Sequence, residues 1–365
     1  MTSDADYMAR ALAVAERGRG TTSPNPIVGA LIVDDEGVVV GRGAHLVAGG
    51  PHAEVLALAD AGERARGATL YCTLEPCSHT GRTGPCAPKV VAAGIRRAVI
   101  AMGDPNPLVS GRGIELLRSQ GVEVAVGILE VDARRQNAPF LTRIGRGRPH
   151  VTMKVALSAD GKVALAGGHS TRLTGDVANR RIHRDRAEVD AIAIGSGTLL
   201  NDDPLLTARI AYRRRPFVRV IFDRRRRTPP AARVLSTLES GPVIIVTKNA
   251  DASSSQEPLI ALTRAGASVE AISPDGETFE DAALRRLAQL GVSSVILEGG
   301  PTTQRAFWDR GLVDRVQMYV VPRPIGPDGL GWWAAVDQVV AELEDVRRTR
   351  LGADMLIEGD VHRID

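Results

Sequence analysis

TLEPCSHTGRTGPC, residues 73–86, places two of the chain's three cysteines nine positions apart in a run of glycine and polar residues. Three interpretations are open for such a pair: a disulfide, a metal site, and ordinary core packing. The third cysteine, Cys72, lies in a strand-like apolar run, and we expect it in the core. Cys77 and Cys86 therefore need a common explanation, and the rest of the sequence has to supply it.

The composition narrows the choice. Hydrophobic residues make up 44% of the chain and charged residues 24%, which is typical of a soluble globular protein. The length of 365 residues suggests about two domains. The first residues, MTSDADYMARALAVAERG, predict an amphipathic helix and not a secretion signal. We therefore expect a cytoplasmic, reducing location, without a membrane span. Such a location argues against a structural disulfide.

Helical and strand-like segments alternate in the first part of the chain, which predicts a layered α/β domain. Helices are expected at 3–19 and 52–62. The expected strands share apolar, β-branched runs and lie at 28–35, 38–45, 69–76, 97–104 and 122–127.

The stretch IGRGRPH, residues 144–150, is rich in glycine and arginine and is the candidate linker. It predicts two domains, 1–147 and 148–365. After it the alternation resumes, with apolar runs that suit a sheet buried on both faces. A closing edge strand is expected at 353–361. The other expected strands of the second domain lie at 151–158, 190–197, 218–223, 242–247, 293–300 and 315–322.

A catalytic zinc takes three protein ligands and leaves a fourth position for water. Cys77 and Cys86 would supply two, and His52 in PHAEV (51–55) offers the third. Glu54 follows His52 by two positions. His-x-Glu, then Pro-Cys and a second cysteine, is the pattern of zinc nucleobase deaminases, in which the glutamate moves protons and does not bind the metal. The spacing predicts Zn²⁺ on His52, Cys77 and Cys86, with Glu54 as the catalytic acid and base.

Other interpretations remain open. His79 lies between the two cysteines and is a rival ligand, although it sits in a polar insert. A purely structural zinc would normally have a fourth cysteine or histidine. Arginine clusters at 213–215 and 224–227 are solvated loops or phosphate sites. A nucleic-acid-editing deaminase would need a basic, aromatic face near the metal, whereas aromatic residues are only 3% of this chain.

Beyond this site, a series of further motifs runs along both halves of the chain: TTSPNPIVGA (21–30), GGPHAEVLAL (49–58), TLEPCSHTGRTGPC (73–86), DPNPLVSGRG (104–113), SADGKVA (158–164), GTLLNDDPLLTAR (197–209) and LEGGPT (297–302). With these motifs in this order, the chain resembles the bifunctional riboflavin-biosynthesis deaminase–reductase family.

The resemblance implies a cytidine-deaminase-like three-layer domain followed by a dihydrofolate-reductase-like α/β domain. It implies hydrolytic deamination of a diamino-ribosylamino-pyrimidinone 5′-phosphate, then reduction of the ribosyl group to ribityl with NADPH. The implied partner is this small molecule, with neither nucleic acid nor membrane involved. Pairing of chains through the reductase domain is a further possibility.

The resemblance also assigns residues. Asn25 would contact the pyrimidine, and Lys154 would lie at the reduction site. Asp202 counts with Glu54 and Lys154 among the catalytic candidates. Gly299 and Gly300, at a strand end before a helix, would let a pyrophosphate approach the main chain. The remaining cofactor positions are Ala156, Arg172, Thr198 and Asp202, and the remaining substrate positions are Ser170, Arg186, Leu206, Arg209 and Glu298.

Two residues depart from the family pattern. Arg172 stands where tryptophan is usual, and Ala159 stands where leucine is usual before Asp160. Neither exchange removes a proton donor, and arginine can still stack or bind phosphate. The loss of the tryptophan nevertheless allows a second interpretation, a deaminase with a degenerate reductase half. Arg172 is the main support for it.

Overall fold

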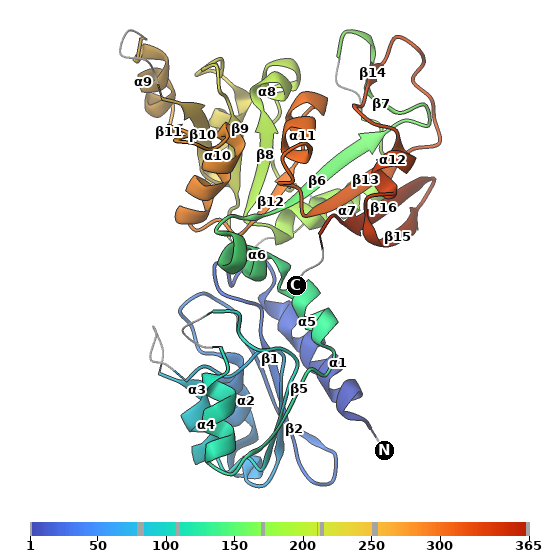
Figure 1. The fold of residues 1–365 in the computed structure, drawn as a ribbon. Coiled ribbons are helices and arrows are strands. Elements are labelled where there is room, and N and C mark those ends of the chain that lie inside the picture. Colours follow the sequence, from blue (N-terminus) through green and yellow to red (C-terminus); the bar gives the residue numbers. More distant parts are fainter. Residues whose placement is uncertain are drawn as a thin grey trace. The chain divides into compact units, whose positions relative to one another are not determined.

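The computed structural model describes residues 2–78, 84–106, 110–168, 172–209, 211, 215–249 and 255–362. It divides into two compact units, of which the first ends at Gly147 and the second begins at Arg148. Figure 1 shows both. None of the described helices combines the length and the apolar composition that a membrane span requires.

The first unit is a three-layer α/β structure. Its five-stranded sheet has the order β2-β1-β3-β4-β5, in which β2, β1 and β3 are antiparallel and β3, β4 and β5 are parallel. Helices α1 and α5 cover one face, and α2, α3 and α4 cover the other (Figure 1). The strands are β1 (Gly29–Val33), β2 (Val39–Ala44), β3 (Thr69–Cys72), β4 (Arg97–Ile100) and β5 (Glu123–Val126). The helices are α1 (Asp4–Ala15), α2 (Ala53–Ala61), α3 (Cys86–Ala92), α4 (Arg112–Ser119), α5 (Glu130–Gln136) and α6 (Ala138–Arg146), with 3₁₀ turns at Glu16–Gly18 and Gly62–Ala65.

Two glycines on β2 bring helix α2 directly onto the sheet. A Cβ on Gly41 would lie 2.2 Å from the carbonyl oxygen of Ala57, and one on Gly43 would lie 2.0 Å from that of Ala53. No side chain fits in that space, so the helix backbone rests on the strand. This contact fixes the start of α2, where His52 and Glu54 lie.

The second unit is built on a nine-stranded sheet of order β11-β10-β9-β8-β12-β6-β13-β16-β15. The first seven strands in this order run parallel, and β16 and β15 complete the sheet in antiparallel pairing. The strands are β6 (His150–Leu157), β8 (Ala191–Gly195), β9 (Val218–Phe222), β10 (Val243–Lys248), β11 (Ser268–Ile272), β12 (Ser294–Leu297), β13 (Arg315–Val320), β15 (Glu344–Leu351) and β16 (Asp354–Asp360). A separate pair is formed by β7 (Lys162–Ala164) and β14 (Leu330–Gly331).

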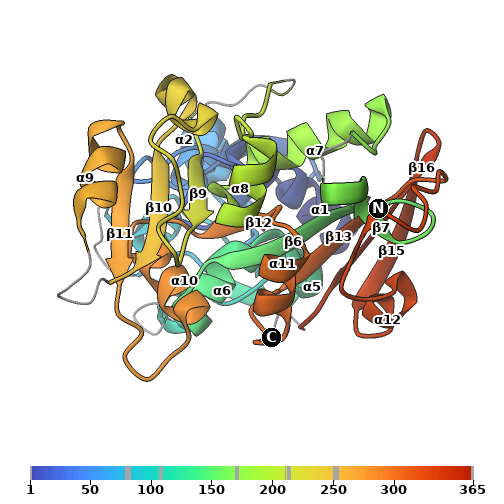
Figure 2. The same cartoon turned by 90° about the horizontal axis from the view of Figure 1, so that it is seen from above.

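Helices cover both faces of this sheet, as the apolar strands predicted (Figure 2). One apolar cluster joins the sheet to Phe279 of α10 and Phe307 of α11, and clusters on the other face include Ile182 of α7 and Leu199 of α8. The helices are α7 (Asp176–Glu188), α8 (Ser196–Asp202), α9 (Glu257–Arg264), α10 (Phe279–Gln289), α11 (Pro301–Trp308) and α12 (Val336–Val340), with 3₁₀ segments at Ala166–Gly168 and Arg233–Ser240.

The structure corrects two expectations. The segment 353–361 is a strand, β16, but it is not the edge of the sheet, because β15 pairs along its outer side. The polar β15 and the half-exposed β11 were not expected as strands at all. The candidate linker 144–150 does contain the boundary between the two units, but the connection is short, since α6 continues to Arg146 and β6 begins at His150.

Candidate functional sites

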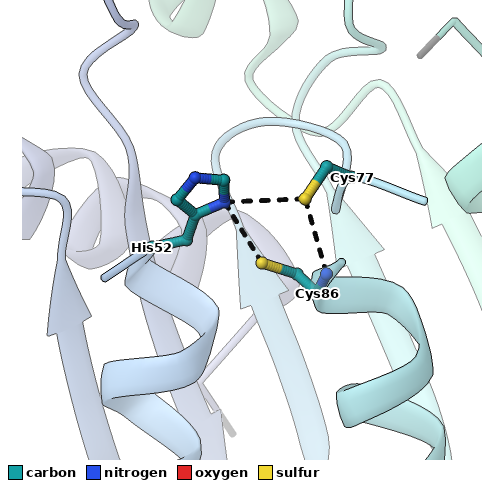
Figure 3. Close-up of side chains that lie close together, drawn as sticks. All are labelled: His52, Cys77 and Cys86. Carbon is teal, nitrogen blue, oxygen red and sulfur yellow. Dashed lines mark hydrogen bonds between the residues drawn. The ribbon is translucent and has the colours of Figure 1, made fainter. Parts of the chain in front are cut away.

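The expected metal ligands converge in the first unit. His52 directly precedes α2, Cys86 is the first residue of α3, and Cys77 lies in the loop after β3. The Nδ1 atom of His52 is 3.6 Å from Sγ of Cys77 and 3.2 Å from Sγ of Cys86 (Figure 3). The three donor atoms lie within 4.8 Å of one another. All three cysteines are free thiols, so the disulfide interpretation is wrong.

The residues present fit a zinc ion. An imidazole nitrogen and two sulfurs that face one point are the donors that zinc prefers. Within the described residues they form the sole group of three or more such side chains. The rival ligand His79 lies outside the described residues.

Without a metal, the two thiols and the imidazole are linked to one another by hydrogen bonds. The thiol of Cys86 donates to Cys77, and its backbone N–H lies 3.4 Å from Sγ of Cys77. Together with His52 they lower the pKa of Cys77 to about 4. The resulting thiolate raises the pKa of Cys86. The hydrogen bond to Cys77 in turn raises the pKa of His52.

Glu54 lies in the first turn of α2, two residues beyond His52, and is only 3% exposed. Burial raises the pKa of its carboxyl to about 7. A carboxyl of that pKa exchanges protons readily near neutral pH. The side chain is thus close to the ligands without being one of them.

Asn25, the expected pyrimidine contact, is held by a residue that the sequence analysis missed. Nδ2 of Asn25 lies 3.1 Å from Nε2 of His45, and Nδ1 of His45 lies 3.0 Å from the carbonyl oxygen of Pro51. The carbonyl requires a proton on Nδ1, so Nε2 accepts from the Asn25 amide. The side-chain oxygen of Asn25 remains as an acceptor for which the described residues provide no hydrogen-bond donor. Burial lowers the pKa of His45, in agreement with a neutral ring.

Glu75 was also missed, although it lies two residues before Cys77. Its buried carboxylate accepts hydrogen bonds from the backbone N–H groups of Asp104, Gly111, Gly113 and Ile114 at 2.8–3.2 Å. The carboxylate thereby caps α4 and ties Asp104 and the start of α4 to the loop that carries Cys77. Nothing local in the sequence signals this contact.

In the second unit, three residues from distant segments meet in a half-buried ionic cluster. Arg186 on α7 donates two hydrogen bonds to the carboxylate of Glu298, at 2.7 and 2.6 Å. Nζ of Lys154 on β6 lies 4.0 Å from the same carboxylate. Burial lowers the pKa of Lys154. For Glu298, burial opposes ionisation, but Arg186 and Lys154 outweigh it and lower the pKa to about 2.

The depressed pKa of Glu298 predicts acid sensitivity of this unit. Ionised Glu298 stabilises the fold fully above its unfolded pKa of 4.5, and this contribution is lost as the pH falls towards 2. From about pH 5 to pH 2 we expect the free energy of unfolding to fall more in the wild type than in Glu298→Gln, by on the order of 3 kcal/mol. Urea unfolding at several pH values measures the difference, and parallel pH curves for the two proteins would contradict the assignment.

The other expected positions of the second unit lie as follows. Oγ1 of Thr198 accepts from the backbone N–H of Gly300 at 2.9 Å, which joins α8 to the start of α11. Asp202 ends α8 with a pKa raised by burial. Ala156 is half-buried on β6, Leu206 is buried, Arg209 is exposed, and Gly299 lies between the end of β12 and the start of α11.

Arg172 is exposed and pairs with Asp176 one turn further on. The expected substrate residue Ser170 lies outside the described residues, as do Arg213 and Arg214 of the first arginine cluster. Arg215 pairs with Asp190, and in the second cluster Nη2 of Arg227 donates to Oγ of Ser196 at 3.0 Å.

Comparison with known proteins gives matches over both units. Residues 1–102 match the family described as the cytidine and deoxycytidylate deaminase zinc-binding region, and residues 149–357 match the RibD C-terminal domain. The chain is 40% identical to the riboflavin biosynthesis protein RibD of Aquifex aeolicus, over 97% of each protein. Among solved structures, RibD of Acinetobacter baumannii is 36% identical over 98% of each chain, with a TM-score of 0.83. A deaminase/reductase from Thermotoga maritima, named for diaminohydroxyphosphoribosylaminopyrimidine and 5-amino-6-(5-phosphoribosylamino)uracil, is 33% identical over 98% of each chain, with a TM-score of 0.84.

Proposed function

This chain belongs to the RibD family of riboflavin biosynthesis proteins, and from that premise we propose which of its residues carry out each reaction. The expected family and fold class are confirmed. The protein is a bifunctional enzyme, a zinc-dependent deaminase and an NADPH-dependent reductase. The deaminase is assigned to residues 1–147 and the reductase to residues 148–365.

The substrate of the first reaction is 2,5-diamino-6-ribosylamino-4(3H)-pyrimidinone 5′-phosphate. The observation that supports hydrolytic deamination is the convergence of His52, Cys77 and Cys86 beside a buried Glu54. Bound zinc lowers the pKa of the water it holds to about 7. Glu54 removes a proton from the attacking water and delivers it to the departing amine, which leaves as ammonia. Asn25, oriented by His45, presents its oxygen to an N–H group of the pyrimidine.

The second reaction reduces the ribosyl group of the deaminated product. NADPH, when bound, supplies a hydride. Conversion of the ribosyl ring to an open ribityl chain would place hydrogen on C1′ and open the C1′–O4′ bond, and O4′ would then need a proton. Lys154 is a half-buried lysine beside Glu298, and it donates this proton. Arg209 holds the phosphate, and Arg186 positions Glu298.

The residues around β8 and β12 fit the cofactor. These parallel neighbours end at Gly195 and Leu297, and α8 and α11 begin just beyond them. A Cβ on Gly195 would lie 2.2 Å from Oγ1 of Thr303, so glycine lets α11 pack closely here, while a Cβ on Gly197 would meet nothing within 4 Å. Gly299, Gly300 and Thr198 are assigned to the pyrophosphate side and Ala156, Asp202 and Arg172 to the remaining contacts, by their match to the family.

Removal of zinc is expected to separate the two activities. Dialysis against a chelator should abolish deamination, because no activated water forms, and should leave reduction of the deaminated intermediate unchanged. Metal analysis should find one zinc per chain, and Cys86→Ser should lose it, whereas Cys72→Ser should keep it, because Cys72 is not part of the group of converging donor atoms. Deamination that survives complete zinc removal would contradict the proposal.

Pairing of chains through the second unit and a cytoplasmic location stay predictions.

A further inference from the structure

A buried histidine that neither reaction uses lies one turn before Arg186 on α7. His183 and Arg186 are three positions apart, so their side chains share a face of the helix. His183 is only 3% exposed. It therefore points to the same side as the residue that binds Glu298.

Two polar atoms at this place lack partners. Within the described residues, neither Nδ1 of His183 nor Oγ1 of Thr207 has a hydrogen-bond partner, although both atoms are buried. The backbone of Thr207 is bound to the cluster, because Nη1 of Arg186 donates to its carbonyl oxygen at 3.1 Å. An unpaired buried polar group costs about 1–3 kcal/mol, so native structures retain few of them. Both residues adjoin Arg186, so a polar ligand bound beside that arginine could supply the missing partners.

The charges around His183 indicate what kind of ligand binds. Arg186 from its own helix, Arg209 from the segment after α8, Lys154 from β6 and Glu298 from the end of β12 all act on the ring. Burial and the two arginines lower the pKa of His183 to about 4, so the ring is neutral at pH 7. A neutral imidazole offers one donor and one acceptor. Because the neighbouring cations attract phosphate, we expect the imidazole to form a hydrogen bond with an oxygen of a phosphorylated sugar.

We propose that His183 is a substrate-binding residue of the reductase, whose Nδ1 forms a hydrogen bond with an oxygen of the substrate's phosphoribosyl group. This inference rests on the proposed reductase site. Thr207 Oγ1 provides a second hydrogen bond to the same group. A ribose hydroxyl and a phosphate oxygen share the required chemistry, and the experiment separates them.

The test uses two variants of nearly equal shape, His183→Leu and His183→Asn, in the full-length enzyme. In His183→Leu we expect the KM for 5-amino-6-(5-phosphoribosylamino)uracil to rise about tenfold, because leucine cannot form the hydrogen bond and the loss of one such bond has roughly this effect. The kcat, the KM for NADPH and the deaminase rate should stay near wild type. His183→Asn retains a polar atom near the position of Nδ1 and should recover most of the affinity.

The dephosphorylated substrate locates the contact. If the penalty of His183→Leu disappears with it, the partner is the phosphate, and if the penalty persists, the partner is a ribose hydroxyl. An unchanged KM in His183→Leu would overturn the inference. Equal KM values in the two variants would also overturn it. A fall in kcat that accompanies a lower melting temperature would do the same, since either result indicates a structural histidine. A wild-type protein that lacks reductase activity would instead refute the proposed function, and the two failures are therefore distinguishable.

Discussion

Replacing Glu54 with glutamine is expected to lower the rate of deamination by about 10²–10⁴-fold, the usual contribution of a general acid–base residue. Glutamine has nearly the same shape but neither accepts a proton from water nor delivers one to the departing amine. The zinc ligands are untouched, so the bound zinc should remain. Ammonia release, measured under saturating substrate, gives the rate, and metal analysis gives the zinc content.

Glu63→Gln is the matched control for this change, because Glu63 is an exposed glutamate in the same unit. It should leave deamination unchanged. Reduction of the deaminated intermediate should be normal in both variants. A Glu54→Gln enzyme that retains zinc and full deaminase activity would show that another group moves the proton, and would favour the structural-zinc interpretation.

Lys154→Met is expected to lower the reductase kcat by about 10²-fold or more, with deamination unaffected. Methionine fills the space of the lysine stem but cannot donate a proton to O4′. The carboxylate of Glu298 keeps its two hydrogen bonds from Arg186, so the cluster should not collapse. Oxidation of NADPH in the presence of the deaminated substrate measures the effect.

Lys248→Met, at the exposed end of β10, controls for loss of a lysine in this unit. It should behave as wild type. Reduction at the wild-type rate by Lys154→Met would exclude the lysine as proton donor. Loss of both activities would instead indicate misfolding, which a thermal unfolding curve of each variant detects.

The metal centre was largely predictable from the sequence, because zinc imposes both residue type and spacing. His52, Glu54, Cys77 and Cys86 lie in short motifs whose chemistry leaves few alternatives. The parallel strands of the second sheet were predictable for a related reason. Strands buried on both faces require continuous apolar runs, and such runs are visible in the sequence.

What could not be predicted depends on contacts between distant segments. Strands β11 and β15 lie at the sheet edges, where one face is exposed, and their polar sequences carry no apolar run. The contact of Asn25 with His45 spans 20 positions, and that of Arg186 with Glu298 spans 112. Neither pair has a local signature. The four backbone hydrogen bonds of Glu75 are likewise a product of the folded loop.

The degenerate-reductase interpretation rests on Arg172. Its pairing with Asp176 at the surface gives no reason for lost chemistry, and the ionic cluster of Lys154, Arg186 and Glu298 is intact. We therefore expect the reductase to be active, and reduction can be measured in the same experiment as deamination.

The most direct measurement is mass spectrometry of the diamino-ribosylamino-pyrimidinone phosphate after incubation with the zinc-loaded enzyme, with and without NADPH. The experiment is run in water labelled with heavy oxygen, which marks the hydrolysed position. Without NADPH, we predict that one amine is replaced by a labelled oxygen and that nothing further changes. With NADPH, the same product should gain two hydrogens. A deaminated product that gains no hydrogens with NADPH would contradict the reductase assignment, and a substrate that stays unchanged in both samples would contradict the account as a whole.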